Sequence, residues 1–180
     1  MIRRAFRRSL ALLAAVLLFA IAAPLAAQDA PAADPKDVGS ADAIVAAVYD
    51  VISGPAGEER DWDRMRSLFL PEARLIPSYA NDSGEIGIQF LSVNDWIDRA
   101  TEWFANNPFY EAEIHRVAER YGHIAHVFST YESKREASGE PFARGINSFQ
   151  LLYDGHRWWV VNIYWQGETP EEPIPATYLP

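Results

Sequence analysis

Three stretches in the first two thirds of the chain carry apolar residues at the spacing of a helix buried on one side. Each follows a residue suited to cap a helix, namely Ser40, Asp61 and Ser92. Gly54-Pro55 ends the first stretch, and prolines close the other two. We therefore predict three helices with these apolar stripes: Ile44, Val45, Val48, Val51 and Ile52; Trp62, Met65, Leu68 and Phe69; Val93, Trp96, Ile97, Ala100, Trp103 and Phe104.

From Phe109 onwards the apolar spacing changes to two, which is typical of strands. A shorter strand, residues 73–79, precedes the third helix. Helices followed by an antiparallel run predict an α+β fold with three N-terminal helices packed on one face of the sheet. The four later strands are predicted at residues 109–120, 123–134, 142–153 and 157–166.

Both ends of the chain differ in composition from its centre. Residues 1–27 combine a cationic start, an apolar run and small residues, which predicts a signal peptide cleaved after Ala27 and a periplasmic or secreted protein. An uncleaved anchor is the alternative. Residues 28–39 are expected to form a disordered leader, residues 40–166 one domain, and residues 167–180 an extended proline-rich tail.

The charge balance limits the possible partners. The full chain has a net charge of −9, and removal of the signal peptide would leave 12 basic against 25 acidic residues. Nucleic acids and anionic membranes require a basic surface, so neither is an expected partner. The absence of cysteine excludes disulfides, thiol nucleophiles and thiolate metal sites.

No cofactor or metal site is expected. His123 and His126 are three residues apart on a predicted strand, so their rings point to opposite faces and cannot share a metal ion. Neither a glycine-rich phosphate loop nor a dinucleotide-binding fingerprint occurs in the sequence.

The order of elements, with the segments "DWDRMRSLFLPEARLI" and "DGHRWWVVNIYW", resembles the nuclear transport factor 2-like superfamily, the SnoaL-like domains. The resemblance covers residues 40–166. It implies a cone-shaped domain with a strongly curved antiparallel or mixed sheet. It does not imply one chemistry, because this scaffold carries isomerases, dehydratases, hydrolases and ligand carriers.

Members that isomerise ketosteroids use a tyrosine and two carboxyl groups in the pocket. Tyr49 lies where the resemblance would place the tyrosine. Pro77 and Phe149 occupy the positions of the two carboxyl groups, so the resemblance does not imply that activity here.

The last hairpin is apolar on both faces, whether its loop has two or four residues. One face is expected to look into a pocket, lined by Asn147, Phe149, Trp158, Asn162 and Tyr164, with Trp96 contributed by the third helix. The other face would then be covered by a second copy of the chain in a homodimer, or by the proline-rich tail. The dimer-face residues are expected to be Trp159, Val161, Ile163 and Trp165.

If the hairpin has the two-residue loop, Asn147 and Asn162 are expected to lie directly opposite each other in this pocket. Buried amides need hydrogen-bonding partners, because an unsatisfied one costs about 1–3 kcal/mol. The two side chains would either bind a ligand or satisfy each other.

Histidines offer the clearest acid–base chemistry. A turn at Tyr121-Gly122 predicts that His115 and His126 are diagonal neighbours beside Glu113, with His126 as base and His115 as relay. The alternative places both rings on the outer face. Glu111, Glu113 and Glu119 are interpreted as a solvated edge.

The sequence thus favours an exported domain that binds a small, largely apolar molecule in an internal pocket. The first alternative is a cofactor-free isomerase, dehydratase or hydrolase that uses His126, His115 and Tyr49 as candidate catalytic residues. The second is a structural or protein-interaction module with a filled core.

Overall fold

The computed structural model describes residues 31–81 and 83–180, and the predicted signal peptide lies outside these residues. The three predicted helices form as α2 (Ala41–Ile52), α3 (Trp62–Leu68) and α4 (Val93–Phe104). Their caps are the expected ones, since Ser40, Asp61 and Ser92 each accept a hydrogen bond from a backbone amide of the first turn. Within the described residues, no helix has the length and apolar content needed to cross a membrane.

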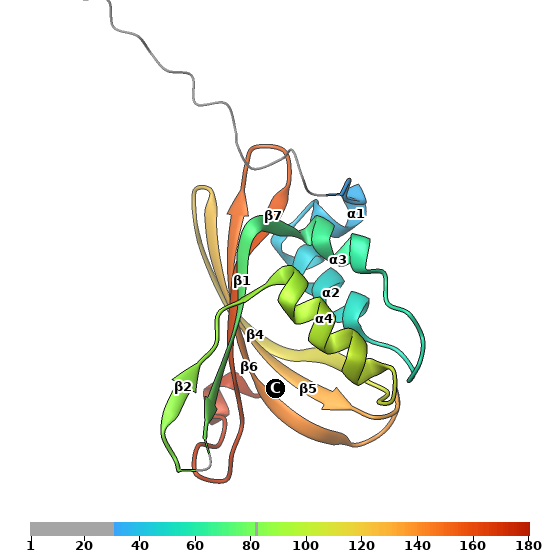
Figure 1. Cartoon of the computed structure of the whole chain (residues 1–180). Helices are drawn as coiled ribbons and strands as arrows, with labels where there is room; N and C mark the ends of the chain where they lie inside the picture. Colours follow the sequence, from blue (N-terminus) through green and yellow to red (C-terminus); the bar gives the residue numbers. More distant parts are fainter. Residues whose placement is uncertain (1–30, 82) are drawn as a thin grey trace, which may run out of the picture.

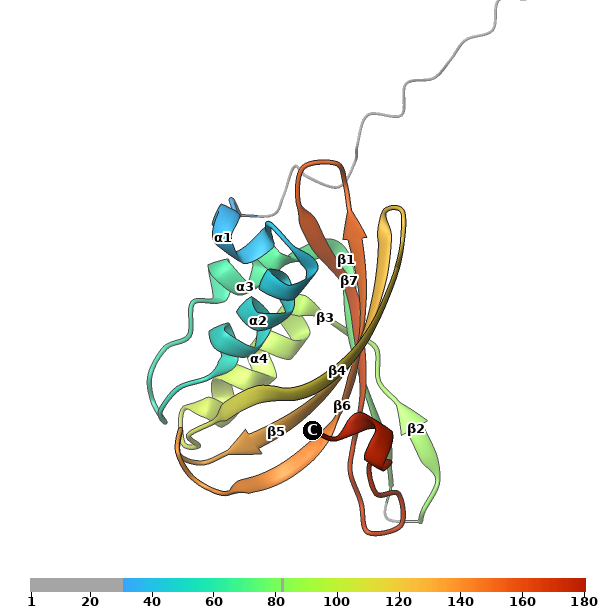
Figure 2. The ribbon, with the colours of Figure 1, turned by 180° about the vertical axis from the view of Figure 1, so that it is seen from behind.

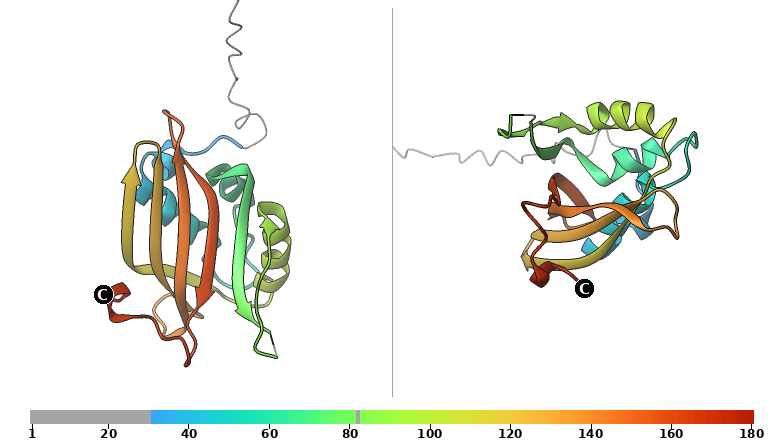
Figure 3. Two further views of the ribbon diagram at one scale, coloured as in Figure 1. Left: turned by 90° about the vertical axis from the view of Figure 1, so that its left-hand side faces the viewer. Right: turned by 90° about the horizontal axis from the view of Figure 1, so that it is seen from below.

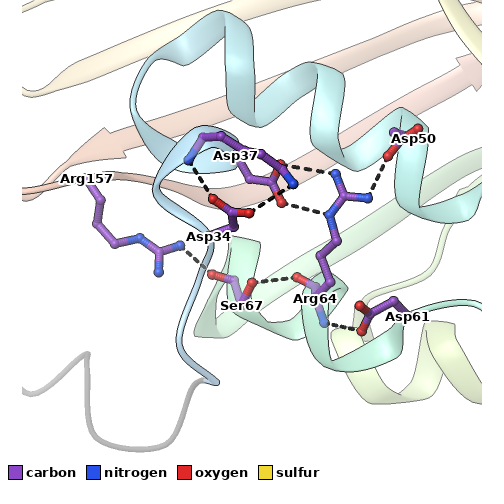
Figure 4. Close-up of polar contacts among 8 residues, drawn as sticks. Asp34, Asp37, Asp50, Asp61, Arg64, Ser67 and Arg157 are labelled. Carbon is purple, nitrogen blue, oxygen red and sulfur yellow. Dashed lines mark hydrogen bonds and ion pairs between the residues drawn. The ribbon is translucent and has the colours of Figure 1, made fainter.

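The leader contains a helix that we did not predict, α1 (Pro35–Val38). Asp34 caps it, and its Val38 is buried. Arg64 on α3 forms a bidentate salt bridge with the buried Asp37 of α1, with N–O distances of 2.7 and 3.1 Å (Figure 4). Its guanidinium also donates a hydrogen bond to Asp50 on α2. The expectation of a disordered leader through residue 39 is therefore wrong from Asp34 onwards, because this ion pair and the burial of Val38 order the segment.

Seven strands among the described residues form one mixed sheet. Six of them lie in the order β2-β1-β7-β6-β5-β4, with β1 and β7 parallel and the other neighbours antiparallel (Figure 3, left). The short β3 pairs with β1 beside β2. The bounds are β1 (Phe69–Ala80), β2 (Ile86–Ile88), β3 (Leu91–Ser92), β4 (Tyr110–Tyr121), β5 (Ile124–Lys134), β6 (Pro141–Tyr153) and β7 (Trp158–Gly167).

The four α-helices of the described residues lie on one face of the sheet, the arrangement predicted for the three N-terminal helices (Figure 1). The ends of β4, β5 and β6 bend towards these helices, which gives the strongly curved sheet of a cone-shaped α+β domain (Figure 2). The core lies between the layers, with Ile44 and Val45 of α2 and Leu68 of α3 fully buried against Phe149 and Val160 of the sheet.

An extra residue in β7 changes the face on which the end of the strand lies. Leu151 pairs with Val160, but the next residue of β6, Gln150, pairs with Asn162, so Val161 has no partner. Such a bulge reverses the alternation of all residues beyond it. Ile163 and Trp165 therefore face the helices, and Asn162 and Tyr164 face outwards.

Several predictions for this hairpin are wrong, because they assumed β6 and β7 to pair without an extra residue. Asn147 pairs with Trp165 and not with Asn162, so the predicted asparagine pair does not exist. The loop between β6 and β7 has four residues, which also separates the two asparagines. Ile163 and Trp165 are not part of an outer dimer face, and Asn162 and Tyr164 do not line the internal cavity between the helices and the sheet. Tyr164 is 45% exposed.

A second extra residue, Ile114, lies in β4. Glu113 pairs with Tyr131 and His115 with Thr130, which leaves Ile114 between them without a partner. The two sides of the bulge therefore face in opposite directions. Glu111 and Glu113 turn to the inner face, and His115 stays on the outer face, which explains why the predicted grouping of Glu113 with His115 is wrong.

The proline-rich tail folds back over part of the outer face. Tyr178, in a short 3-10 helix at Ala176–Tyr178, packs its ring against Phe128 with 5.1 Å between ring centroids. Its carbonyl accepts a 2.7 Å hydrogen bond from Thr130, which is completely buried. Trp159, predicted to face a dimer partner, is instead buried beneath the guanidinium of Arg157.

Candidate functional site

A cavity of about 320 Å³ lies between helices α2 and α4 and the inner face of the sheet. This volume is at the lower end of the range typical of small-molecule sites. Its walls are mainly aromatic and aliphatic. The lining residues are Val48, Tyr49, Ile52, Met65, Leu75, Trp96, Phe109, Glu111, Tyr131, Ser133, Phe142, Ala143, Asn147, Phe149, Ile163 and Trp165.

Glu111 is placed by a clip between the end of α2 and the start of β4. Gly54 and Phe109 exchange two backbone hydrogen bonds, at 2.7 and 3.0 Å. The hydroxyl of Ser53 accepts a 3.0 Å hydrogen bond from the Glu111 amide. Together with the bulge at Ile114, these contacts fix the Glu111 backbone so that its side chain turns into the cavity.

A chain of hydrogen bonds crosses the polar end of the cavity. Asn147 donates to the Tyr49 hydroxyl at 3.1 Å, and the Tyr49 and Ser129 oxygens are 2.7 Å apart. Ser129 in turn donates to Glu113. Because the Ser129 proton goes to Glu113, the Tyr49 hydroxyl must donate to Ser129, and its proton is already committed.

The Glu111 carboxyl group is the acid of the cavity. Burial raises its pKa to about 7, although hydrogen bonds from Ser133, at 2.8 Å, and Asn147 favour the charged form. Burial also raises the pKa of Tyr49 and of Tyr131, so both phenols stay neutral at physiological pH.

Tyr131 reaches the cavity wall because it pairs with a glycine. Its cross-strand partner is Gly145, and a β-carbon at that position would clash with the Tyr131 hydroxyl and with a backbone oxygen of β7. Only glycine leaves room for the phenol ring here.

The structure brings together some of the predicted site residues and separates others. Asn147, Phe149, Trp96 and Tyr49 lie in the cavity wall. Trp158 is buried on the inner face but does not line the cavity. Ile163 and Trp165, predicted for the dimer face, are wall residues.

The histidine pair is not a site. His115 lies opposite Thr130 and His126 opposite Glu119, four residues along the hairpin from each other. This offset corresponds to about 13 Å, too far for a shared proton. Both face outwards, and the His126 ring lies 3.0 Å from the Ser148 hydroxyl.

Glu111 is the site residue that sequence reasoning missed. The sequence interpretation placed it on a solvated edge, whereas its side chain lies in the cavity wall, on the inner side of the bulge at Ile114. The sequence contains one indication that Glu111 faces inwards, which is Phe109. It is a large apolar residue two positions earlier, so placing it in the core would also have placed Glu111 inside.

The described part of the chain has no cluster of three or more metal-ligating side chains. The residues in the cavity wall can themselves provide apolar contact, hydrogen bonds and a carboxyl group that exchanges protons.

This architecture is the fold of the nuclear transport factor 2-like and cystatin-like proteins. The sequence itself matches no protein-family profile and no curated protein. A nuclear transport factor 2-like protein of unknown function from Silicibacter pomeroyi superimposes with a TM-score of 0.50 and 17% identity, over 72% of this chain and 94% of its own.

Two cystatin-like proteins are similar to a comparable degree. One from Nostoc punctiforme gives a TM-score of 0.54 at 8% identity, over 71% of this chain and 87% of its own. One from Caulobacter vibrioides gives 0.50 at 12% identity, over 72% and 88%. At such identities the likeness concerns the fold and carries no activity with it.

The pKa of Glu111 makes folding stability depend on pH. A carboxyl group with an ordinary pKa of 4.5 when unfolded and about 7 when folded is best accommodated in its protonated form. The stability that the protonated Glu111 contributes to the fold is therefore fully present below pH 4.5 and is lost as the pH rises through 7. Glu111→Gln should remove this loss. The free energy of unfolding of the variant, relative to that of the wild type, should therefore rise by up to about 3 kcal/mol between pH 5 and pH 8.

Urea denaturation across this pH range measures the difference. Glu119→Gln, on the exposed part of the same strand, is the control and should follow the wild type at every pH. A constant difference between Glu111→Gln and the wild type would show that Glu111 titrates normally.

Proposed function

We propose that this protein binds a small, largely apolar molecule in the cavity between α2, α4 and the sheet. The supporting observation is an open space of about 320 Å³ with seven aromatic side chains in its wall and polar groups at one end. A purely structural module would fill this space with side chains. The predicted export would place the binding in the periplasm or outside the cell.

Blocking the cavity mouth tests this proposal. Ala143 lines the cavity and is exposed, so it lies where the cavity opens to solvent. Ala143→Trp should weaken binding of 3-phenylpropan-1-ol, measured by isothermal titration calorimetry, by at least about tenfold. Ala118→Trp, an exposed position on β4 outside the lining, should bind like the wild type. Binding that is absent in the wild type, or equal in both variants, would contradict the proposal.

A second candidate function is cofactor-free proton transfer, with Glu111 as acid or base. It is favoured by one observation, a buried carboxyl group inside a cavity whose pKa of about 7 suits both roles at neutral pH. The histidines proposed from the sequence have no part in it.

Deuterium exchange tests this candidate. We expect the wild type in D₂O to speed deuterium incorporation beside the carbonyl of 4-phenylbutan-2-one, followed by NMR. With Glu111→Gln the rate of deuterium incorporation should be at least about a hundredfold lower, as expected for removal of a general base. Glu119→Gln is the matched control. Equal rates with wild type and Glu111→Gln would exclude Glu111 as the base.

We also propose that two copies pair through the part of the outer face that the tail leaves open. Support comes from exposed apolar residues there, Val117, Tyr121 and Ile124 on the β4–β5 hairpin and Tyr164 on β7. Such residues favour a symmetric contact in which the same surface meets itself.

Analytical ultracentrifugation measures this pairing. Ile124→Asp should weaken self-association by at least about tenfold, because it places a charge in an apolar contact. Ile86→Asp should leave self-association unchanged. Ile86 is also exposed, but it lies on β2, which pairs with β1 at the other edge of the sheet. A wild-type chain that stays monomeric at high concentration would contradict the proposal.

A further inference from the structure

The cavity holds an acid without a base. Glu111 lines it together with apolar residues, two tyrosines, Ser133 and Asn147. None of the described residues in the lining is a lysine, arginine or histidine. An ionised Glu111 would therefore have hydrogen-bond donors but no counter-charge inside the cavity.

Two cationic side chains of a neighbouring cleft already have other partners. A polar cleft on the far side of Glu111 includes Arg116 and Lys134. Arg116 forms ion pairs with Glu113 and with Asp42. Lys134 forms one with Glu132 at 2.6 Å. Because both cations are paired with other carboxylates, a cationic group that enters the cavity can pair with Glu111.

The walls suit a cation as well as the acid does. Seven aromatic residues line the cavity, and the faces of such rings attract ammonium groups. Removing both the ring faces and the carboxylate from water strengthens this attraction. The aromatic lining residues are Tyr49, Trp96, Phe109, Tyr131, Phe142, Phe149 and Trp165.

From this arrangement we propose that the cavity selects small organic cations, amines with an apolar body, and that Glu111 is their counter-ion. This inference rests on the proposed binding function and specifies its ligand class. Ser133 donates to one oxygen of the carboxylate, Oε2, and the ammonium group takes the free lone pairs. The apolar body of the ligand lies against the aromatic walls.

Amine binding is then coupled to a proton. In the empty cavity near neutral pH, part of the Glu111 population is protonated, and an ammonium ion drives that proton to the solvent. The other ionisable groups of the cavity are Tyr49 on α2 and Tyr131 on β5, and both phenols stay neutral. The polar cleft that Glu111 also lines adds Asp50, Tyr110, Glu113, Arg116, Glu132 and Lys134. While the amine stays protonated, its affinity should therefore level off above the pKa of Glu111 of about 7 and fall by up to about tenfold per pH unit below it.

Three probes of one shape test the inference by calorimetry at pH 8. They are 3-phenylpropylamine, 3-phenylpropan-1-ol and 3-phenylpropanoate, which differ in charge at one end. The wild type should bind the amine at least about tenfold more tightly than the alcohol, as expected for a hydrogen bond to a charged partner. The carboxylate should bind least.

Glu111→Gln should lose about tenfold or more in amine affinity and keep its alcohol affinity within about threefold. Glu111→Asp retains the charge and should restore part of the preference, and Glu119→Gln should behave like the wild type. The ranking of the probes with wild-type protein does not depend on how any variant folds.

The possible outcomes separate the two proposals. Equal affinity for amine and alcohol, or an amine affinity that Glu111→Gln does not change, overturns the selection of cations and leaves the binding function intact. Failure of all three probes to bind overturns both. A preference for the carboxylate would assign the opposite charge to the ligand and contradict the inference directly.

Discussion

The cavity depends on one unpaired residue in each of two strands, Ile114 in β4 and Val161 in β7. Each bulge reverses the alternation of its strand, so that a strand can present apolar residues to the core at one end and cavity residues at the other. Without the first, Glu111 would face solvent. Without the second, Trp165 would leave the wall and Tyr164 would replace it.

Holding Glu111 inside is energetically unfavourable, and the surrounding structure offsets this cost only in part. Ser133 and Asn147 donate to its carboxylate, yet its pKa remains near 7. An apolar residue of similar size would avoid this cost altogether. The clip between Ser53 and the Glu111 backbone nevertheless fixes the residue in this place. A rigidly positioned, poorly compensated acid is typical of a functional group.

The helices and strands follow from local signals, and the direction of individual side chains does not. Ser40, Asp61 and Ser92 predict the helix starts because capping is a contact between near neighbours. The period of two predicts β4 to β7 almost to the residue. The bulges escape prediction because Ile114 and Val161 are ordinary strand residues, without the glycine that often marks such sites. Every assignment beyond each bulge was therefore reversed, and this affected Glu111, Asn162 and Trp165.

Both candidate functions use the same carboxyl group but require different behaviour from it when a ligand is bound. A bound ammonium ion lowers the pKa of Glu111 and keeps it ionised, so it can no longer donate a proton near neutral pH. Proton transfer requires the pKa to stay close to 7 beside a neutral substrate. None of the described wall residues is basic, so none of them would hold the carboxylate charged in the absence of ligand. The charge of the ligand therefore decides whether Glu111 acts as a counter-ion or as an acid–base group.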